Sequence, residues 1–370
     1  MSTTRRPVVM LANGHPPFDT RIFVKEARTL RHAGYEVSII LPHDKDEEKE
    51  GIKILATTPI RHGFDKLFLS PWRIFRKALK QPRRSIFVIH DSDILFVGIW
   101  LKLTRRKVVY DAHEDTPLQI SYQHWIPRPL RKPYGWMYFL IEKICGWMFD
   151  AIVVAEPIIA RYFPREKTYL VRNFPSAISF REHSGKPYAL RKNWLTYVGA
   201  LTEPRGLYEM LEGAKAAEAA ASFEFVLGGK FSPPRLETDV LTRYRVNFLG
   251  WVSYAGLVDL LFESKVGIII PHPNPRYVTN YPVKLFEFMA AGLPVIASKE
   301  GEAAKFVQEC NGGILVDPLN MNEVCDAIVW LFTHPEEAEA MGQRGQRLIF
   351  EKYNWEKEEE TLVGVVRGVV

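Results

Sequence analysis

Lys284 and Glu287 are charged residues three positions apart in the segment YPVKLFEFMAAGLPVIAS, residues 281–298. This spacing puts both on one face of a helix that begins at Pro282, a residue that suits a first helical turn. Free N–H groups at a helix N-terminus favour anions, and a lysine beside them adds a full positive charge. A glutamate on the same face can accept hydrogen bonds from a sugar diol. From the residues alone, the pair predicts a solvated surface pair, with a phosphate and sugar site as the alternative.

A second polar group follows the apolar run in VVYDAHEDTP, residues 108–117. Asp111, His113, Glu114 and Asp115 come directly after what reads as a buried strand. Open α/β sheets bind their ligands at the carboxyl ends of their strands. His113 is therefore a candidate for contact with a substrate, and a purely structural hydrogen-bonding role is the alternative.

The loop after the first apolar run, residues 7–12, offers further polar residues. Gly14 follows an asparagine and could form a tight turn at the mouth of a sheet. Asp19 can cap the helix that carries Arg21. The GxGxxG fingerprint of dinucleotide sites is absent. We predict a cap at Asp19, with a catalytic role as the alternative.

Two features could indicate a metal, and neither is specific. Asp91 and Asp93 have the Asp-x-Asp spacing that can hold Mg²⁺ or Mn²⁺, but aspartate and serine are also common helix caps. Cys145, Cys310 and Cys325 are far apart and form no Cys/His cluster with the spacing of a zinc site. We therefore expect no metal, and free thiols in a reducing compartment.

The scaffold that must position these residues is predicted by length and apolar periodicity. The 370 residues exceed one ordinary core, and 47% hydrophobic with 25% charged residues is typical of a soluble globular protein. Short apolar strands alternate with helical patterns in both halves, which predicts doubly wound parallel sheets. We expect Rossmann-like domains at 1–180 and 181–352, and a terminal helix at 353–370. The mixed-charge stretch 44–50 reads as a solvated loop.

Charge is unevenly distributed between the halves. Residues 1–185 hold 30 Lys and Arg against 19 Asp and Glu, and the remaining residues hold 19 against 24. The first half therefore has a net charge of +11 and the second a net charge of −5. This difference predicts an anionic partner for the first domain.

Residues 61–84, RHGFDKLFLSPWRIFRKALKQPRR, concentrate this charge, with eight basic residues and one acid, Asp65. An apolar stripe recurs there at helical spacing and comprises Phe64, Leu67, Phe68, Pro71, Trp72, Phe75 and Leu79. Such a stripe can pack into a core, or it can lie in a membrane interface when basic residues flank it. The one-sided charge favours docking on an anionic membrane surface.

A second segment can extend this surface, since it holds Arg128, Arg131 and Lys132 beside Trp125 and Trp136. The first apolar run is too short for a signal peptide, and no apolar run is long enough to span a bilayer. We therefore expect a cytoplasmic protein that is peripheral on the inner face of the cell membrane.

Several of these segments together resemble a known family. KLFEFMAAGLPVIAS (284–298) resembles the nucleotide-sugar signature of the retaining glycosyltransferases of family 4, which have the GT-B fold. YDAHE (110–114), HPPFDTRI (15–22) and YVGALTEPRGL (197–207) resemble other motifs of that family. The resemblance covers nearly the whole chain. It implies two Rossmann-like domains facing a cleft, an acceptor side in the first, a nucleotide side in the second, and a C-terminal helix crossing back to the first.

The resemblance also implies roles for individual residues. Glu287 would hold the donor ribose, Arg205 and Lys284 the diphosphate, and His113 would face the donor sugar. Other positions are expected to line the site: Gly14, Lys230, Val252 and Leu285 on the donor side, and Asp19 and Arg21 on the acceptor side. Two positions depart from the family pattern. Thr279 stands where the family has a first glutamate, and Ala200 stands where it has a first basic residue.

The implied reaction moves a sugar from a UDP- or GDP-sugar to a hydroxyl of a lipid-linked or polysaccharide-precursor acceptor. It would proceed with retention, without a metal or other cofactor. A sugar-nucleotide epimerase or a phosphorylase can share the fold. An inactive nucleotide-sugar binding module is a further alternative, because of the two departures. A nucleic-acid binder would suit the basic first half, but no nucleic-acid-binding motif is present.

Overall fold

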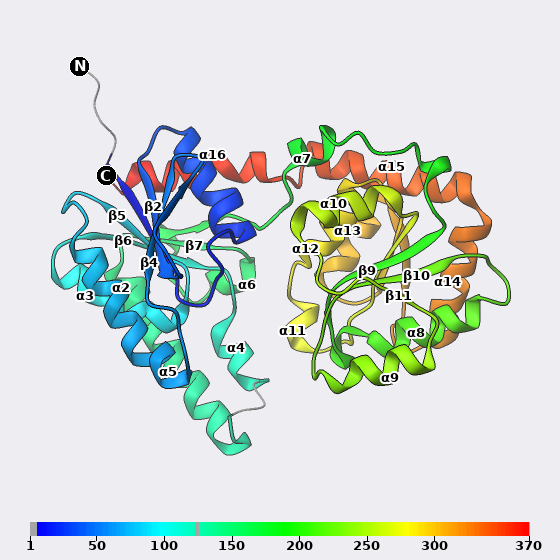
Figure 1. Ribbon diagram of the computed structural model, residues 1–370, viewed down its shortest axis with the longest axis horizontal. Helices are drawn as coiled ribbons and strands as arrows, with labels where there is room; N and C mark the ends of the chain where they lie inside the picture. The colour runs from blue at the N-terminus through cyan, green and yellow to red at the C-terminus, as the bar shows by residue number, and fades with distance from the viewer. Residues whose placement is uncertain (1–5, 123–125, 370) are drawn as a thin grey trace. The chain divides into compact units, whose positions relative to one another are not determined.

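The computed structural model describes residues 6–122 and 126–369 and is drawn as a ribbon in Figure 1. Two compact units can be separated. The first unit comprises Met1–Asn173 and Glu356–Val370, and the second unit comprises Phe174–Trp355. The C-terminal segment therefore groups with the first unit, although it follows the second in the chain. Each unit has its own sheet and its own core.

The first unit is built on an eight-stranded sheet with the order β3-β4-β2-β1-β5-β6-β7-β8. Its strands are β1 (Val8–Leu11), β2 (Val37–Pro42), β3 (Glu47–Lys49), β4 (Ile52–Thr57), β5 (Ile86–Ile89), β6 (Lys107–Ala112), β7 (Ala151–Val154) and β8 (Thr168–Leu170). All neighbouring strands are parallel except β3 and β4. Its helices and helical turns are η1 (Thr20–Ala27), α1 (Arg28–His32), η2 (Asp65–Leu69), α2 (Ser70–Leu79), η3 (Ser92–Ile94), α3 (Leu95–Leu103), α4 (Thr116–Ser121), α5 (Arg128–Met148), α6 (Pro157–Ala160), η4 (Arg165–Lys167) and α16 (Trp355–Gly368).

The charged stretch 44–50 is not only a loop, contrary to expectation. Glu47–Lys49 forms β3, which pairs antiparallel with β4 at the edge of the sheet. Its side chains are mostly exposed. Charged residues are compatible with an edge strand, because only one of its sides is paired. Polarity alone therefore did not distinguish this strand from a loop.

The second unit is built on a six-stranded parallel sheet with the order β11-β10-β9-β12-β13-β14. Its strands are β9 (Trp194–Leu201), β10 (Glu224–Phe231), β11 (Asn247–Phe248), β12 (Val266–Ile269), β13 (Val295–Ser298) and β14 (Gly313–Val316). Its helices and helical turns are α7 (Ala177–Arg181), η5 (Tyr188–Leu190), η6 (Glu203–Arg205), α8 (Leu207–Ala217), α9 (Arg235–Arg243), α10 (Tyr254–Glu263), α11 (Pro275–Val278), α12 (Val283–Ala290), α13 (Glu302–Cys310), α14 (Met321–Thr333) and α15 (Pro335–Glu351). The predicted doubly wound α/β architecture is confirmed in both halves of the chain.

Local chain signals account for the segment 281–298. Helix α12 begins directly after Pro282 and ends before Gly292, whose φ of 73° is a left-handed conformation that favours glycine. Strand β13 follows and is buried along its whole length. Its continuous apolar run is typical of a strand in a parallel sheet that helices cover on both faces. The predicted helix and strand are therefore confirmed.

The strand order predicts where each unit binds a ligand. We call this place, the carboxyl end of the sheet at its switch point, the ligand edge. In the first unit, the order runs outward in both directions from the pair β1 and β5, and in the second unit from the pair β9 and β12. Ligands of doubly wound sheets bind at such switch points, beyond the carboxyl ends of the strands. The segments that follow these four strands begin at residues 12, 90, 202 and 270. They are where functional side chains are expected.

Gly206 links β9 to α8 by a turn that admits only glycine. Its φ is 77°, and a Cβ at this position would overlap the backbone carbonyl oxygen of Ile270. We predict that Gly206→Ala destabilises the second unit by at least about 1–2 kcal/mol, the cost of a left-handed conformation for an L-residue. Scanning calorimetry should show a lowered Tm.

The matched control is Gly364→Ala, on α16. A Cβ at Gly364 meets nothing within 4 Å. An alanine inside a helix is more favourable than a glycine by about 0.5–1 kcal/mol, so this control should raise stability slightly. Equal Tm values for the two variants would contradict the close approach at Gly206.

Candidate active site

Arg205 lies at the switch point of the second unit. It ends η6, directly after β9, and its guanidinium carbon is 5.7 Å from the ring centroid of Tyr277 in α11. Burial lowers its pKa, but the nearby hydroxyls of Tyr197 and Tyr277 outweigh this and raise the pKa. The side chain thus connects the segments that follow β9 and β12. A permanently charged guanidinium at this edge can bind a phosphate.

Lys284 and Glu287 form the pair that their spacing predicts. In α12, Lys284 Nζ lies 3.0 Å from Glu287 Oε2. The lysine side chain is 32% exposed and the glutamate only 2%, so the pair is not a solvated surface pair. Glu287 Oε2 makes no hydrogen bond of good geometry with any described residue. Since buried polar atoms normally have a partner, this oxygen can accept a hydrogen bond from a ligand.

The other donor-side residues fall into two groups. Lys230 is exposed near the end of β10, and its ammonium lies 5.2 Å from the ring centroid of Trp251. Val252 follows Trp251 in the chain and is half-buried. Leu285 is fully buried, and its N–H donates to the carbonyl oxygen of Pro282. Its side chain therefore belongs to the core and supports α12 without facing a ligand.

The positions that depart from the family pattern have structural partners. The Thr279 hydroxyl donates to the carbonyl oxygen of Pro275 at 2.9 Å, within the turn of α11. The carbonyl oxygen of Ala200 accepts a hydrogen bond from the Tyr197 hydroxyl at 3.0 Å. Neither position supplies a charge to the edge.

His272 is a polar residue of this edge that the sequence reasoning missed. It follows β12, its N–H donates to the carbonyl oxygen of Pro204, and its Nε2 is 2.8 Å from Glu209 Oε1. It therefore braces the turn that carries Arg205. The signal that could have found it is PHPNP, a polar turn directly after the apolar run 266–270.

A large hollow of the second unit lies at the opposite edge of the sheet. It has a volume of about 1180 Å³ and lies at the amino ends of β9 and β10, where Lys192, Trp194 and Glu224 line it. Ligands of doubly wound sheets bind at the carboxyl edge. Size alone therefore does not make this hollow the candidate site.

In the first unit, Asp91 holds the turn after β1. Its Oδ2 accepts hydrogen bonds from the N–H groups of Asn13 (2.6 Å) and Gly14 (3.1 Å). Asp93 Oδ2 accepts a hydrogen bond from Asn13 Nδ2 at 2.9 Å and lies 3.6 Å from Lys66 Nζ. The Asp-x-Asp pair thus anchors a loop across the switch point. The N–H of Gly14 is already committed to Asp91.

His15 lies between two carboxylates and was also missed. Its Nδ1 is 3.4 Å from Asp19 Oδ2, and its Nε2 is 3.3 Å from Asp91 Oδ1. Burial lowers the pKa of His15, but these two carboxylates outweigh burial and raise the pKa to about 10. His15 is therefore a cation at neutral pH. Its position in HPPFDTRI, right after the first strand and its turn, is the signal that could have found it.

Asp19 caps a helix, as predicted. Its Oδ1 accepts hydrogen bonds from the N–H groups of Arg21 (2.8 Å) and Ile22 (3.0 Å) at the start of η1. Burial raises the pKa of Asp19, but His15 and these N–H groups lower it to about 2. The carboxylate stays ionised and faces His15.

Arg21 turns into the interior of the first unit. Its guanidinium pairs with both oxygens of Asp111, at 2.8 Å from Nε and 2.6 Å from Nη2, and Nε is 3.0 Å from Glu26 Oε1. Its side chain is only 4% exposed. The guanidinium also donates hydrogen bonds to the carbonyl oxygen of Val171, at 3.3 Å from both Nη1 and Nη2. Direct contact with an acceptor would require Arg21 to leave these partners.

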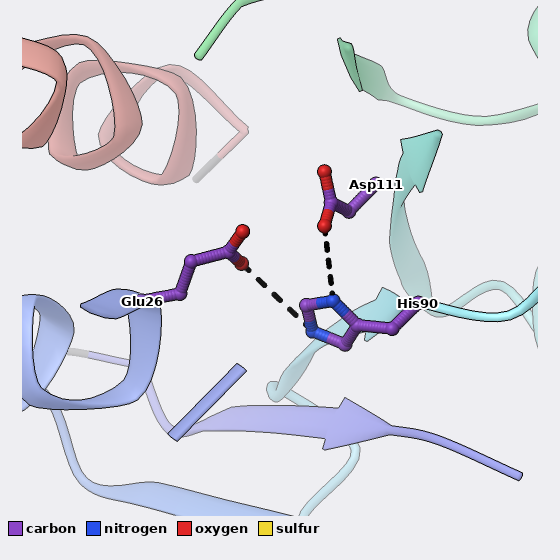
Figure 2. Close-up of side chains that lie close together, drawn as sticks. All are labelled: Glu26, His90 and Asp111. Carbon is purple, nitrogen blue, oxygen red and sulfur yellow. Dashed lines mark hydrogen bonds and ion pairs between the residues drawn. The ribbon is translucent and has the colours of Figure 1, made fainter. Parts of the chain in front are cut away.

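Figure 2 shows that Glu26, His90 and Asp111 lie close together. His90 Nδ1 is 3.1 Å from Asp111 Oδ2, and His90 Nε2 is 3.9 Å from Glu26 Oε2. Potential ligand atoms of the three residues lie within 4.8 Å of one another, a spacing that could hold a metal ion. Arg21, however, already places a permanent positive charge against both carboxylates. We interpret the cluster as an ion-pair network.

The network ends on His113. Its Nδ1 is 3.4 Å from Asp111 Oδ2 and 3.3 Å from the Asp111 carbonyl oxygen. Burial lowers the pKa of His113, but Asp111 outweighs burial and raises it. The His113 ring meets the His15 ring edge-on, with centroids 5.3 Å apart. Asp111 is thus a positioning residue that orients His113 at the carboxyl edge of the sheet.

The raised pKa of His15 makes a prediction about pH. A folded-state pKa of about 10, above the ordinary value of about 6.5, contributes stability below about pH 6.5 that is lost as the pH rises through 10. His15→Gln should therefore lower the Tm more at pH 6 than at pH 9.5. Between those values the free-energy difference should shrink by up to about 1.4 kcal/mol per pH unit. Parallel Tm curves against pH for the wild type and the variant would contradict a charged His15.

Comparison with known proteins gives matches in both units. The family model described as Glycosyltransferase Family 4 matches residues 21–173. The model described as Glycosyl transferases group 1 matches residues 192–334. Together they cover most of the chain.

Individual relatives agree with these models. A GDP-mannose-dependent alpha-(1-6)-phosphatidylinositol monomannoside mannosyltransferase of Mycobacterium tuberculosis is 33% identical over 91 residues, which is 25% of this chain and 24% of that protein. The match thus spans about a quarter of that relative's length. An MMP alpha-(1->4)-mannosyltransferase of Mycolicibacterium hassiacum is 22% identical over 80% of this chain and 73% of that protein.

A solved structure shows the same fold. Anabaena Alr3699/HepE in complex with UDP-glucose has a TM-score of 0.74 at 13% sequence identity, covering 98% of this chain and 100% of that one. Both parallel-sheet units are thus matched along their length. The chain therefore belongs to the glycosyltransferases of family 4, which have the GT-B fold.

Proposed function

We propose that this glycosyltransferase moves a sugar from a UDP- or GDP-sugar to a hydroxyl of a lipid-linked or polysaccharide-precursor saccharide, with retention of configuration. The observation that carries the proposal is the pair in α12. A buried Glu287 carboxylate with accepting capacity lies 3.0 Å from a half-buried lysine, in the unit whose switch point also holds Arg205. The relatives named above include a GDP-mannose-dependent transferase and a protein bound to UDP-glucose, which supports these two donor classes.

The proposed roles follow from charge. Arg205 and Lys284 would stabilise the diphosphate, where negative charge develops as the sugar leaves. Glu287 would accept hydrogen bonds from the donor ribose. His113, oriented by Asp111, would position the donor sugar. The acceptor hydroxyl would attack from the face that the diphosphate leaves, which gives retention without a nucleophile from the protein.

We propose that no metal takes part. Asp91 and Asp93 accept hydrogen bonds from the turn after β1, and Asp91 also faces His15. These contacts occupy the oxygens that an Asp-x-Asp metal site would need, although Asp93 Oδ1 has no hydrogen-bond partner among the described residues. Two fixed cations, Arg205 and Lys284, would take the part that a metal takes at a leaving diphosphate.

The proposed place of action is the inner face of the cell membrane. Cys145, Cys310 and Cys325 are free thiols, which suits a reducing compartment. Phe64, Phe68 and other aromatic residues of the segment 61–84 are exposed, which supports an acceptor carried by a membrane.

Glu287→Ala should weaken donor binding. Loss of charge-assisted hydrogen bonds to the ribose costs about 1.5–3 kcal/mol, which is about 10- to 150-fold in Kd. Isothermal calorimetry with UDP- and GDP-sugars measures this change, and thermal unfolding checks that the variant folds. The control is Glu237→Ala, an exposed glutamate of α9, which should bind as the wild type does.

The same titration separates phosphate contacts from ribose contacts. Arg205→Ala and Lys284→Ala should weaken binding of the nucleoside diphosphate more than binding of the free nucleoside. Equal losses for both ligands would remove the phosphate role, and unchanged affinity in a folded Glu287→Ala would remove the ribose role.

His113→Ala should keep the fold and lower kcat by about 10²-fold or more, the scale of a lost transition-state interaction. Sugar transfer is assayed with EDTA present, because the proposed reaction uses no metal. His32→Ala, which alters an exposed histidine at the end of α1, is the control and should keep the wild-type rate. Wild-type turnover in His113→Ala, or loss of wild-type activity in EDTA with rescue by Mn²⁺, would overturn the mechanism.

A further inference from the structure

Three helices of the first unit form one layer over one face of its sheet. Helix α3 contacts both α2 and α5, and Figure 1 shows the three on the same side of the unit. Their inward residues Ile74, Leu101 and Cys145 join one core with strand residues such as Phe87 and Tyr110. The rings of Trp72 and Phe75 in α2 lie 6.0 and 5.1 Å from that of Trp100 in α3. The layer therefore has one inner face and one outer face.

The outer face carries most of the large apolar side chains that the described residues expose. On and before α2 these are Phe64, Leu67, Phe68, Leu69, Trp72 and Leu79; on α3, Phe96 and Leu103; on α5, Leu130, Trp136, Met137, Leu140, Ile144 and Trp147. Trp136 is 64% exposed and Trp147 76%. An apolar surface of this extent marks an interaction site.

The structure tests one of the two interpretations of the stripe in 61–84, that it packs into a core. The apolar residues of α2 that are buried are Pro71, Ile74 and Ala78, whereas Phe64, Phe68 and most of the stripe are exposed. The interpretation as a core stripe is therefore wrong for most of its members. Trp125, expected to extend the surface, lies outside the described residues, and α5 supplies a second exposed stripe that the sequence reasoning did not identify.

Charge on the outer face has one sign. Arg76, Lys80, Arg128, Lys132 and Lys143 are exposed, whereas the ammonium of Lys66 lies 3.6 Å from Asp93 Oδ2 at the ligand edge. The acids of the segments 61–80, 95–103 and 126–148 are Asp65 and Glu142, and both are buried. Asp65 pairs with Arg73 at 2.8 Å, and Glu142 accepts a hydrogen bond from the Tyr110 hydroxyl at 3.1 Å. Burial raises the pKa of Glu142 to about 8, so that even this group is largely uncharged at neutral pH.

We propose that the outer face of α2, α3 and α5 is a docking surface for an anionic lipid bilayer. Tryptophan and phenylalanine side chains would enter the interface, and the basic residues among them would contact lipid phosphates. A second copy of this face would oppose like charges, which disfavours self-association. None of the helices described in the structure is long and apolar enough to cross a bilayer, so the interaction is at the surface.

The docking would serve the proposed lipid-linked acceptor, and to that extent it rests on the proposed function. Binding itself needs neither donor nor acceptor. A failure to dock would therefore leave the transfer reaction intact, and a failure of transfer would leave docking intact. The two proposals can be tested separately.

The test is sedimentation of the full-length chain with vesicles of phosphatidylcholine alone or with about 30% phosphatidylserine. We expect binding to the anionic vesicles at least about 10-fold stronger, and much weaker binding in about 0.5 M salt, where charges are screened. The triple variant Trp136→Ser, Ile144→Ser, Trp147→Ser should lose binding at low salt. The control is Leu190→Ser with Leu319→Ser, two exposed leucines of the second unit, which should bind normally.

Charge reversal tests the basic residues. Arg76→Glu, Lys80→Glu, Lys132→Glu and Lys143→Glu together should abolish binding while calorimetry shows unchanged nucleotide affinity. Arg73 and Lys77 are left intact, because they pair with Asp65 and Asp46. Equal binding to neutral vesicles, or none to anionic vesicles at low salt, would overturn the proposal. So would a dimer, seen by analytical ultracentrifugation, that the serine variant dissociates.

Discussion

The bidentate ion pair between Arg21 and Asp111 organises the ligand edge of the first unit. It joins η1, which follows β1, to the end of β6, and both partners are buried. Removing one partner of a buried pair leaves an uncompensated charge and costs about 3–5 kcal/mol. His90, Glu26 and His113 are arranged around it. The edge is therefore held by a buried ion-pair network, in which Glu26 Oε1, Glu26 Oε2 and His90 Nε2 make no hydrogen bond with any described residue.

The charged residues of the second unit's ligand edge are fewer and lie on the segments around β9, β12 and α12. Arg205 lies against the ring of Tyr277, and Glu287 Oε2, which is ion-paired with Lys284, makes no hydrogen bond with any residue that the structure describes. Arg205 precedes Gly206, where the backbone packs so closely against Ile270 that a Cβ would not fit. The first unit orients a histidine, whereas the second holds a buried carboxylate beside a lysine. This difference is the basis of the roles proposed for them in sugar positioning and donor binding.

The helical layer of the first unit buries its acidic residues and exposes large apolar ones. Asp65 and Glu142 turn inward to specific partners, whereas Trp136 and Trp147 remain outside. Ordinary surface helices place charges outside and apolar residues inside. The partial inversion is consistent with a partner that provides both an apolar medium and negative charge.

The sequence by itself determined the doubly wound α/β class, the helix and strand of 281–298, the one-turn spacing of Lys284 and Glu287, and the cap at Asp19. These features depend on local chain geometry, where a spacing of three residues or a proline before a helix has a fixed consequence. Tertiary structure alone decided that Asp91 holds Asn13 and Gly14, that His15 meets His113, and that Arg21 turns inward to Asp111. It also decided that Glu47–Lys49 is an edge strand and that most of the stripe of 61–84 is exposed. Each of these features depends on the order of the strands and on which face of an element its neighbours cover. Contacts between residues far apart in the chain determine both the strand order and this coverage.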